Sequence, residues 1–425
     1  MSPAERRQGA SPAGPLAGIR VVDCSTVLAG PYCTMLLADL GADVVKVEPP
    51  EGDSTRSWGP PWVGDAAAGT RTAAYYLAVN RNKRSLRLDL RQEAGRAVLG
   101  RLLATADVVV ENFRVGGFQK LGFSDEALGE LNPELIHLAI SGYGTTGPDA
   151  AKPGYDFVIQ AVGGLMSITG EPDGRPLKVG VAISDVVSGL FGAVAVLAGL
   201  AGRARSGRNE TTGRGAGGSL GAGQRIDVSL LESTLAVLVN QAQNAFVTGR
   251  APRRRGTAHP SIVPYETFAT ADGEIAIGVG SQKQWRSFCT VVSLEGLTDD
   301  PRFASNGARV EHRAELIPLL GAALRGATTA AWLTSLDAAG IPCGPILDVE
   351  AAFATPQAVA RGSRVPLQHP ALGAVDQIGI PFRLSRTPAS IRTPPPLLGE
   401  QGTEILAEAG YSAAEIATLV ADGVV

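Results

Sequence analysis

Asp185 is the first residue whose surroundings suggest chemistry, because it is the one carboxylate in the apolar stretch VGVAISDVVSGLFGAVAVLAGLAGR at residues 179–203. An aspartate in this place often caps a helix, since its oxygens accept the unpaired N–H groups of the first turn. Apolar neighbours also leave little water around the carboxylate, which suits a nucleophile. On position alone the sequence favours the cap and leaves the nucleophile open.

Other polar residues pose the same choice between a structural and a chemical role. Asp156 follows Gly154-Tyr155 at the start of a predicted helix and is interpreted as a cap. The four histidines lie far apart in the sequence, so no Ser/His/Asp arrangement is indicated. The basic stretches NRNKR (80–84) and Arg253–Arg255 could bind anions, although solvated surface is the more common role of such residues.

Composition limits the classes of function. The 425 residues are 44% hydrophobic, which is enough for two or more packed domains. A balance of 38 basic and 41 acidic residues gives no sign of a nucleic-acid partner. Four scattered cysteines without a CxxC pair indicate neither a zinc site nor a disulfide framework. The apolar run at 186–201 is short for a membrane span, so we expect a cytoplasmic protein without membrane or metal.

The elements that must position these residues alternate between strand and helix patterns. Strands are predicted at 18–23, 43–48, 85–90, 108–111 and 135–141, and helices at 31–40 and 92–104. This order predicts an α/β fold with a Rossmann-like parallel sheet. The first strand-to-helix turn, CSTVLAGP, lacks G-x-G-x-x-G, so dinucleotide binding is not supported.

Changes in composition predict how the chain divides. We expect a flexible leader at 1–14, a large Rossmann-like domain at 15–224, a linker helix at 225–250, a small α/β domain at 251–340, and a return linker with the C-terminal part of the large domain at 341–425. The glycine-rich run at 207–223 is predicted to be a flexible connection or insertion. In the small domain, residues 268–280 predict a hairpin that turns at Asp272-Gly273.

Taken in order, these segments resemble the class III CoA-transferases, which include formyl-CoA and carnitine CoA-transferases and have the 2-methylacyl-CoA racemases as relatives. The resemblance covers residues 15–425. It is carried by GIRVVDCSTVLAGPYCTMLLADLGADVVKVEPPEGDSTR, NRNKRSLRLDL, ADVVVENFRVGGFQKLGF, LNPELIHLAISGYGTTGP, GYDFVIQAVGGLMSITGEPDG, DVVSGLFG, GQRIDVSLLES, GIPCGPILDV and LLGEQGTEIL. It implies CoA transfer from succinyl-CoA or another short-chain acyl-CoA to a free carboxylic acid. It also implies an interlocked, ring-like homodimer, and CoA as a substrate with no separate cofactor.

The resemblance implies that Asp185 is the nucleophile, which forms a mixed anhydride and then an aspartyl-CoA thioester. The related racemases carry a histidine where this chain has Tyr155. Tyrosine has a pKa of about 10, which suits α-proton abstraction poorly and favours the transferase branch. Two alternatives stay open: a 2-methylacyl-CoA racemase or isomerase, and a CoA-binding protein without turnover.

Further site residues also follow from the resemblance. It implies CoA contacts along the chain at Val27, Lys83, Asn112, Phe113, Lys120 and Tyr155. Lys83 matches a phosphate-binding lysine, and Lys120 stands where an arginine often holds the adenosine phosphates. The segment after Arg253-Arg254-Arg255 resembles members that handle short dicarboxylic acids, so Arg254 or Arg255 is a candidate partner for a second carboxylate.

Overall fold

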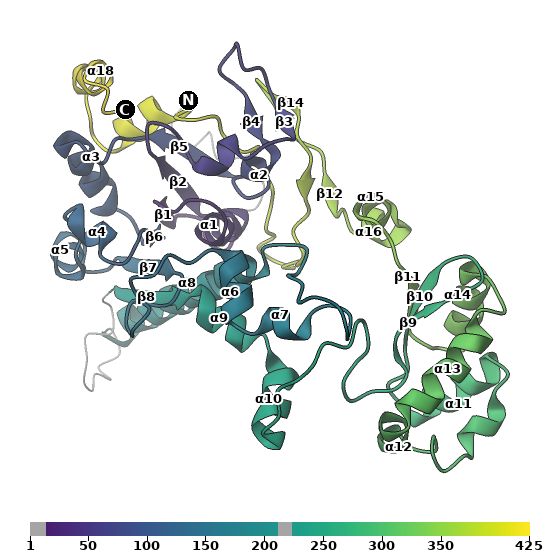
Figure 1. Ribbon diagram of the computed structural model, residues 1–425. Coiled ribbons are helices and arrows are strands. Elements are labelled where there is room, and N and C mark those ends of the chain that lie inside the picture. Colours follow the sequence, from purple (N-terminus) through teal and green to yellow (C-terminus); the bar gives the residue numbers. More distant parts are fainter. Residues whose placement is uncertain (1–13, 211–222) are drawn as a thin grey trace. The chain divides into compact units, whose positions relative to one another are not determined.

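The computed structural model describes residues 14–210 and 223–425 (Figure 1). The predicted leader therefore lies outside the described residues, apart from its last position. The chain divides into two compact units. The larger unit contains the segment up to Gly163, Gly180–Val239 and Gln357–Val425, and the smaller unit contains Gly164–Val179 and Asn240–Pro356. The smaller unit thus extends beyond the expected 251–340 on both sides.

The larger unit is built on a parallel sheet, which has six strands within the described residues, in the order β5-β2-β1-β6-β7-β8. Its strands are β1 (Arg20–Asp23), β2 (Asp43–Glu48), β5 (Lys83–Arg87), β6 (Val108–Glu111), β7 (Ile136–Ser141) and β8 (Gln224–Ser229). The first five match the predicted strands within a few residues. They were recognisable because a sheet covered on both faces is built from nearly continuous apolar runs.

Helices cover both faces of this sheet (Figure 1). They are α1 (Ala29–Asp39), α3 (Glu93–Leu103), α5 (Asp125–Leu131), α6 (Asp156–Val162), α8 (Ile183–Glu210), α9 (Leu230–Ala236), α17 (Gly402–Glu408) and α18 (Ala413–Ala421). Neighbouring residues on β1 enter different cores: Val21 packs with α1 and α8, whereas Val22 packs with α3, α17 and α18. The predicted Rossmann-like α/β fold is confirmed.

One predicted element is wrong. Residues 225–250 do not form a linker helix, because Gln224–Ser229 is strand β8, paired in parallel with β7. Helices α9 and α10 (Val239–Thr248) follow it. The alternating sequence QRIDVS fits an edge strand with one covered face. The glycine-rich run before it obscured the place where the connection from α8 ends and this strand begins. Helix α8 continues to Glu210, and the rest of that run, 211–222, lies outside the described residues.

Helix α8 contains a stretch, Ile183–Ala204, that is long and apolar enough to cross a membrane by length and composition alone. In the structure, 44% of its most apolar window is buried inside the protein. Ala193, Val196 and Leu200 belong to the same core as β1, β6 and β7. The core helix of an α/β domain passes the same test, so we interpret α8 as a core helix.

The smaller unit has its own core and its own antiparallel sheet, in the order β11-β10-β9. Its elements are α7 (Leu165–Ile168), β9 (Tyr265–Ala269), β10 (Glu274–Gly278), α11 (Gln282–Val291), η3 (Glu295–Thr298), α12 (Asn306–Glu311), α13 (Arg313–Leu324), α14 (Thr329–Ala338), β11 (Cys343–Pro345) and α15 (Val349–Ala354). Strands β9 and β10 form the predicted hairpin, and Thr270 N–H donates to Gly273 O at 2.9 Å across its turn.

Shorter elements complete the chain. They are η2 (Ser54–Ser57), β3 (Trp62–Val63), β4 (Thr72–Ala73), α2 (Ala74–Leu77), α4 (Gly117–Lys120), α16 (Pro356–Ala360), β12 (Arg364–Val365), β13 (Gln368–His369), β14 (Gly373–Ala374) and β15 (Gln377–Ile378). The C-terminal segment then returns to the large sheet. Asn82, beside β5, accepts the N–H groups of Arg392 (2.6 Å) and Thr393 (3.0 Å) and donates to Ser390 O (2.9 Å).

Candidate active site

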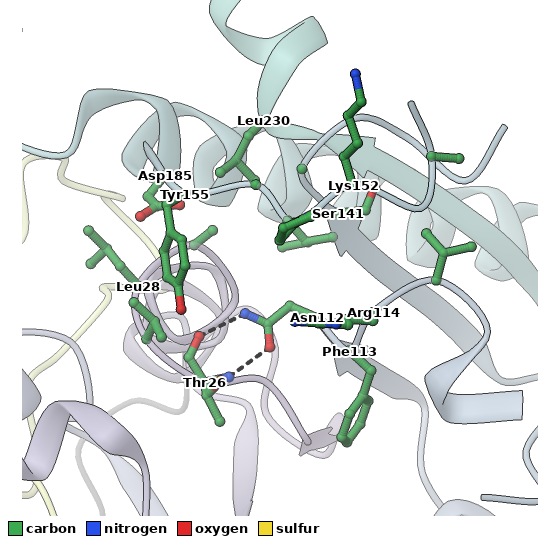
Figure 2. Close-up of a pocket in the computed structure, with 18 of the residues that line it drawn as sticks. Thr26, Leu28, Asn112, Phe113, Arg114, Ser141, Lys152, Tyr155, Asp185 and Leu230 are labelled. Carbon is green, nitrogen blue, oxygen red and sulfur yellow. Dashed lines mark hydrogen bonds between the residues drawn. The ribbon is translucent and has the colours of Figure 1, made fainter. Parts of the chain in front are cut away.

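A cavity of about 240 Å³ opens at the carboxyl ends of β1, β6 and β7 (Figure 2). Ligand sites of parallel sheets form at this edge, because the loops that follow the strands meet there. Its lining comes from residues 26–29, 112–115, 140–142 and 150–155, together with Asp185 and Leu230. Of the predicted site residues, the fold brings together Val27, Asn112, Phe113, Tyr155 and Asp185.

Asp185 lies inside the first turn of α8 and does not cap it. The capping contact comes from Asp156, whose Oδ1 accepts Ser184 N–H at 2.8 Å and whose Oδ2 accepts Gln160 Nε2 at 2.8 Å. The interpretation of Asp185 as a cap is therefore wrong. The prediction that Asp156 caps the helix that it begins, α6, is also wrong, because its carboxylate caps α8 instead. Within the described residues, no hydrogen bond or ion pair engages the Asp185 carboxylate.

The first turn of α8 is fixed by buried contacts on both sides of Asp185. Thr234 Oγ1 donates to Ser184 Oγ at 2.7 Å, and Ser188 Oγ donates to Ser184 O at 2.7 Å. One turn later, a Cβ on Gly189 would lie 2.6 Å from Ala29 O, so glycine lets α8 pack closely against the start of α1. These contacts hold Asp185 at the cavity wall with little freedom to move.

Burial first, and then the negative charge of Asp156, together raise the pKa of Asp185 to about 7. Such a carboxyl ionises near neutral pH, yet its carboxylate is poorly solvated and unpaired. A carboxylate in this state is more reactive toward a carbonyl carbon than one surrounded by water or paired with a cation. Perturbed carboxyls in clefts are characteristic of functional sites.

The turn between β1 and α1 forms the wall below Asp185 in Figure 2. Thr26 N–H donates to Asn112 Oδ1 at 2.9 Å, and Asn112 Nδ2 donates to Thr26 O at 2.8 Å. Val27 has φ 71°, which is unfavourable for a β-branched residue, and its N–H faces the Asp53 carboxylate at 3.3 and 3.4 Å. The side chains of Asn112 and Asp53 thus hold this turn in a strained shape.

Tyr155 lies beside Asp185 at the start of α6 and is 64% exposed (Figure 2). Its position depends on a close approach of two loops: a Cβ on Gly154 would lie 2.5 Å from the Cα of Gly142. The described residues that line the cavity include no histidine. The position that a racemase would use for acid–base chemistry is therefore held by an exposed tyrosine.

Lys83 is not part of this cavity. Its ammonium is fully buried and donates to Asp23 Oδ2 (3.0 Å), Pro31 O (2.9 Å) and Asn80 Oδ1 (2.9 Å). Burial lowers the pKa of Lys83 to about 8. The predicted phosphate contact is corrected to a structural role, because the ammonium would have to leave three partners to reach a ligand. Lys120 is exposed at the end of α4 and does not line the cavity either, so its CoA contact stays a prediction.

Sequence reasoning missed three residues at or near the site. Arg114 and Lys152 line the cavity and bring positive charge to it. The sequence could have indicated both residues, because Arg114 directly follows the predicted Asn112-Phe113 pair and Lys152 lies in the loop before Tyr155. Nothing in the sequence indicates Tyr75 on α2, because only folding brings it near Asp185. Burial first, and then the charges of Asp185 and Asp156, raise the pKa of Tyr75 to about 12.

No group of three or more His, Cys, Asp or Glu residues within 14–210 and 223–425 could hold a metal ion. The arrangement offers a half-buried carboxylate as nucleophile, cations at the rim for an anionic ligand, and backbone N–H groups at the start of α1, which has no side-chain cap.

The chain is similar to known proteins along most of its length. A family model described as CoA-transferase family III matches residues 16–402. A succinate–glutarate CoA-transferase of Agrobacterium fabrum is 44% identical over 395 residues, covering 93% of this chain and 95% of that protein. A human succinyl-CoA:glutarate CoA-transferase is 39% identical over 413 residues, covering 97% of this chain and 90% of that protein.

A solved structure agrees with these sequence comparisons. The crystal structure of a CAIB/BAIF family protein from Brucella suis matches with a TM-score of 0.80 at 42% sequence identity, and covers 94% of this chain and 100% of that chain. The family match extends over both compact units and includes every lining residue of the cavity at Asp185. The chain therefore belongs to CoA-transferase family III and is a CoA-transferase.

Proposed function

We propose that this enzyme transfers CoA from succinyl-CoA to a short dicarboxylic acid such as glutarate, with Asp185 as the nucleophile. The choice of substrates is supported by the similar proteins from Agrobacterium fabrum and human, which are named for succinate, succinyl-CoA and glutarate. The observation that carries the mechanism is the state of Asp185. It is a poorly solvated, unpaired carboxyl with a pKa of about 7 at the edge of a parallel sheet.

The proposed reaction begins when a carboxylate oxygen of Asp185 attacks the thioester carbonyl of the donor. The C–S bond breaks, CoA leaves as a thiolate, and a mixed anhydride remains. The thiolate then attacks the Asp185 carbonyl of the anhydride, forms an aspartyl-CoA thioester and releases the donor acid as a carboxylate. The acceptor carboxylate repeats the two steps in reverse order and regenerates Asp185. No proton is consumed, so no general base is needed.

The cavity offers groups for each part of the substrate. Arg114 and Lys152 can meet CoA phosphates from the rim, in place of Lys83. Phe113 also lines a neighbouring apolar cavity of about 290 Å³, which suits the less polar parts of CoA. N–H groups in the first turn of α1, beside Leu28 and Ala29, are suited to stabilise the oxyanion of each tetrahedral intermediate.

The two other functions make different demands on the site. A 2-methylacyl-CoA racemase needs an acid–base pair at the α-carbon, and the exposed phenol of Tyr155 meets that need poorly. A CoA-binding protein without turnover gains nothing from an unpaired carboxyl, which burial destabilises when it is charged. Deuterium incorporation at the α-carbon in the absence of any acceptor acid would identify a racemase.

The test of the proposed function is CoA exchange from succinyl-CoA to a panel of mono- and dicarboxylic acids. We expect dicarboxylates to be preferred, parallel lines in double-reciprocal plots, and a loss of at least about a thousandfold in Asp185→Asn. Asp299→Asn is the matched control, since Asp299 is an exposed carboxylate outside the lining. Equal activity of Asp185→Asn and the wild type would refute the proposal. The interlocked homodimer and the cytoplasmic location stay predictions.

A further inference from the structure

The smaller unit contains a second polar cavity, of about 740 Å³, which the proposed reaction does not use. Its lining residues all belong to this unit. They are Gln241, Asn244, Thr248, Arg250, Ala251, Pro252, Arg253, Arg255 and Pro260. A concave space of this size is in the range that proteins use for small organic ligands.

Three arginines line this cavity: Arg250, Arg253 and Arg255. Arg254, between the last two, does not line it. Its Nε donates to Glu171 O at 3.2 Å and its Nη2 to Gly174 O at 2.8 Å. Arg254 therefore ties the segment to residues 171–174, while the residues on either side of it line the cavity.

The backbone adds to this anchor. Gly256 N–H donates to Gly170 O at 3.0 Å, which fixes the segment directly after Arg255. The positions of Arg253 and Arg255 are thus set by the fold, although their side chains are exposed. This separates them from an ordinary solvated run of arginines, where all members are equivalent.

The opposite wall is the face of α10 that carries Gln241, Asn244 and Thr248, which are spaced three and four residues apart and so share one side of the helix. The carboxamides of Gln241 and Asn244 have no hydrogen-bond partner in the described part of the chain. Such carboxamides can donate to carboxylate or phosphate oxygens, just as guanidinium groups do.

Charge in the cavity is unbalanced. Its described lining contains no aspartate or glutamate. The nearby Arg313 is already paired with Glu266 at 3.0 Å. Burial lowers the pKa of Arg313, and the positive charge of Arg255 lowers it further, which indicates that these two cations repel one another. A bound anion would relieve this repulsion.

We propose that the cavity formed by α10 and residues 250–260 is an anion site, which takes a small organic ligand with two or more carboxylate or phosphate oxygens. Arg253 and Arg255 bind the anion, Arg250 closes the site, and Gln241 and Asn244 donate hydrogen bonds from α10. This assignment rests on the cavity alone and does not depend on the proposed transfer reaction. It also replaces Arg254 with Arg253 and Arg255 as the arginines available to a ligand.

The test uses isothermal titration calorimetry on the full chain at constant ionic strength, with glutarate and inorganic pyrophosphate as probes. The test variant is Arg253→Gln/Arg255→Gln. The control is Arg286→Gln/Arg325→Gln, which removes the same charge from exposed positions of the same unit outside the cavity. Because all four side chains are exposed, both variants are expected to keep the wild-type melting temperature.

We expect at least one probe to bind the wild type and the control equally, and the Arg253/Arg255 variant at least tenfold more weakly. Loss for glutarate alone would identify a dicarboxylate site, and loss for pyrophosphate alone a phosphate site. Equal binding of the probes to the wild type and to both variants would overturn the proposal, because the probes would then bind elsewhere, as glutarate would if it bound only at Asp185. Absence of binding to the wild type, or the same weakening in both variants, would overturn the proposal.

Discussion

At the scale of single residues, the site depends on two neighbouring carboxyls with different tasks. The carboxylate oxygens of Asp156 accept hydrogen bonds from Ser184 and Gln160, whereas the carboxylate of Asp185 has no hydrogen-bond or ion-pair partner in the described chain. Asp156 also lies close enough to Asp185 for its negative charge to raise the pKa of Asp185. One carboxylate thus builds the helix start and tunes the second, which is left for chemistry.

This division of tasks predicts the pH dependence of the reaction. Because attack requires ionised Asp185, kcat/KM is expected to rise with pH and to level off above a pKa of about 7. Asp156→Asn keeps an oxygen for Ser184 N–H but removes the charge, so the rising limb should move to lower pH. Steady-state rates between pH 5 and 9 in the free-enzyme regime would show this shift. An unchanged limb in Asp156→Asn would contradict the electrostatic coupling.

At the scale of elements, the turn between β1 and α1 is held by side chains from distant strands. The amide of Asn112, directly after β6, forms hydrogen bonds with both backbone groups of Thr26. Asn112 was expected to contact CoA, but its geometry is that of a residue that positions Thr26 and the strained Val27. Preorganised walls of this kind are what a nucleophile needs when its substrate must approach in one orientation.

We therefore expect Asn112→Ala to lower kcat more than it raises KM for the acyl-CoA. The loss of two hydrogen bonds should also lower the free energy of unfolding by about 1–3 kcal/mol. Urea unfolding measures that loss, and hydrogen exchange at the Thr26 amide should become faster. A rise in KM alone, with unchanged protection of Thr26, would show instead that Asn112 acts by binding CoA directly.

Elements also show how far the sequence could be read. Strands β1, β2, β5, β6 and β7 were predictable because buried strands are apolar runs, and the doubly wound order follows from their spacing. Strand β8 was missed, since an edge strand with polar residues after a glycine-rich run has a weak pattern. Asp185 was found, but its capping role belonged to Asp156, because the capping contact joins two helices that are separate in the sequence. The predicted phosphate contact of Lys83 was wrong for the same reason. Its partner Asp23 is distant in the sequence, and only the fold brings the two side chains together.

At the scale of the whole molecule, the functional carboxyl opposes stability. The pKa of Asp185 is raised from 3.8, its ordinary value, to about 7 in the folded protein. A raised pKa means that the stabilising contribution is present below the unfolded value and is lost as pH rises through the folded value. Above pH 7 the folded enzyme must therefore hold a charged carboxylate in a poorly solvated place.

Asp185→Asn removes this burden and is expected to be more stable than the wild type at pH 8, on the order of 2–4 kcal/mol. The difference should shrink toward zero near pH 4, where Asp185 is neutral in the folded state. Melting temperatures of both proteins across this pH range provide the comparison. If Asp185→Asn is less stable than the wild type at pH 8, the Asp185 carboxylate has stabilising contacts in the folded protein, which contradicts its description as unpaired.

The central claim is that Asp185 carries CoA during turnover, and trapping tests it most directly. The enzyme is incubated with succinyl-CoA without an acceptor, treated with borohydride or hydroxylamine, digested and analysed by mass spectrometry. We expect a donor-dependent mass change on the peptide that contains Asp185, with no change on the peptide that contains Asp156. An unmodified Asp185 peptide, together with full activity of Asp185→Ala, would contradict the account.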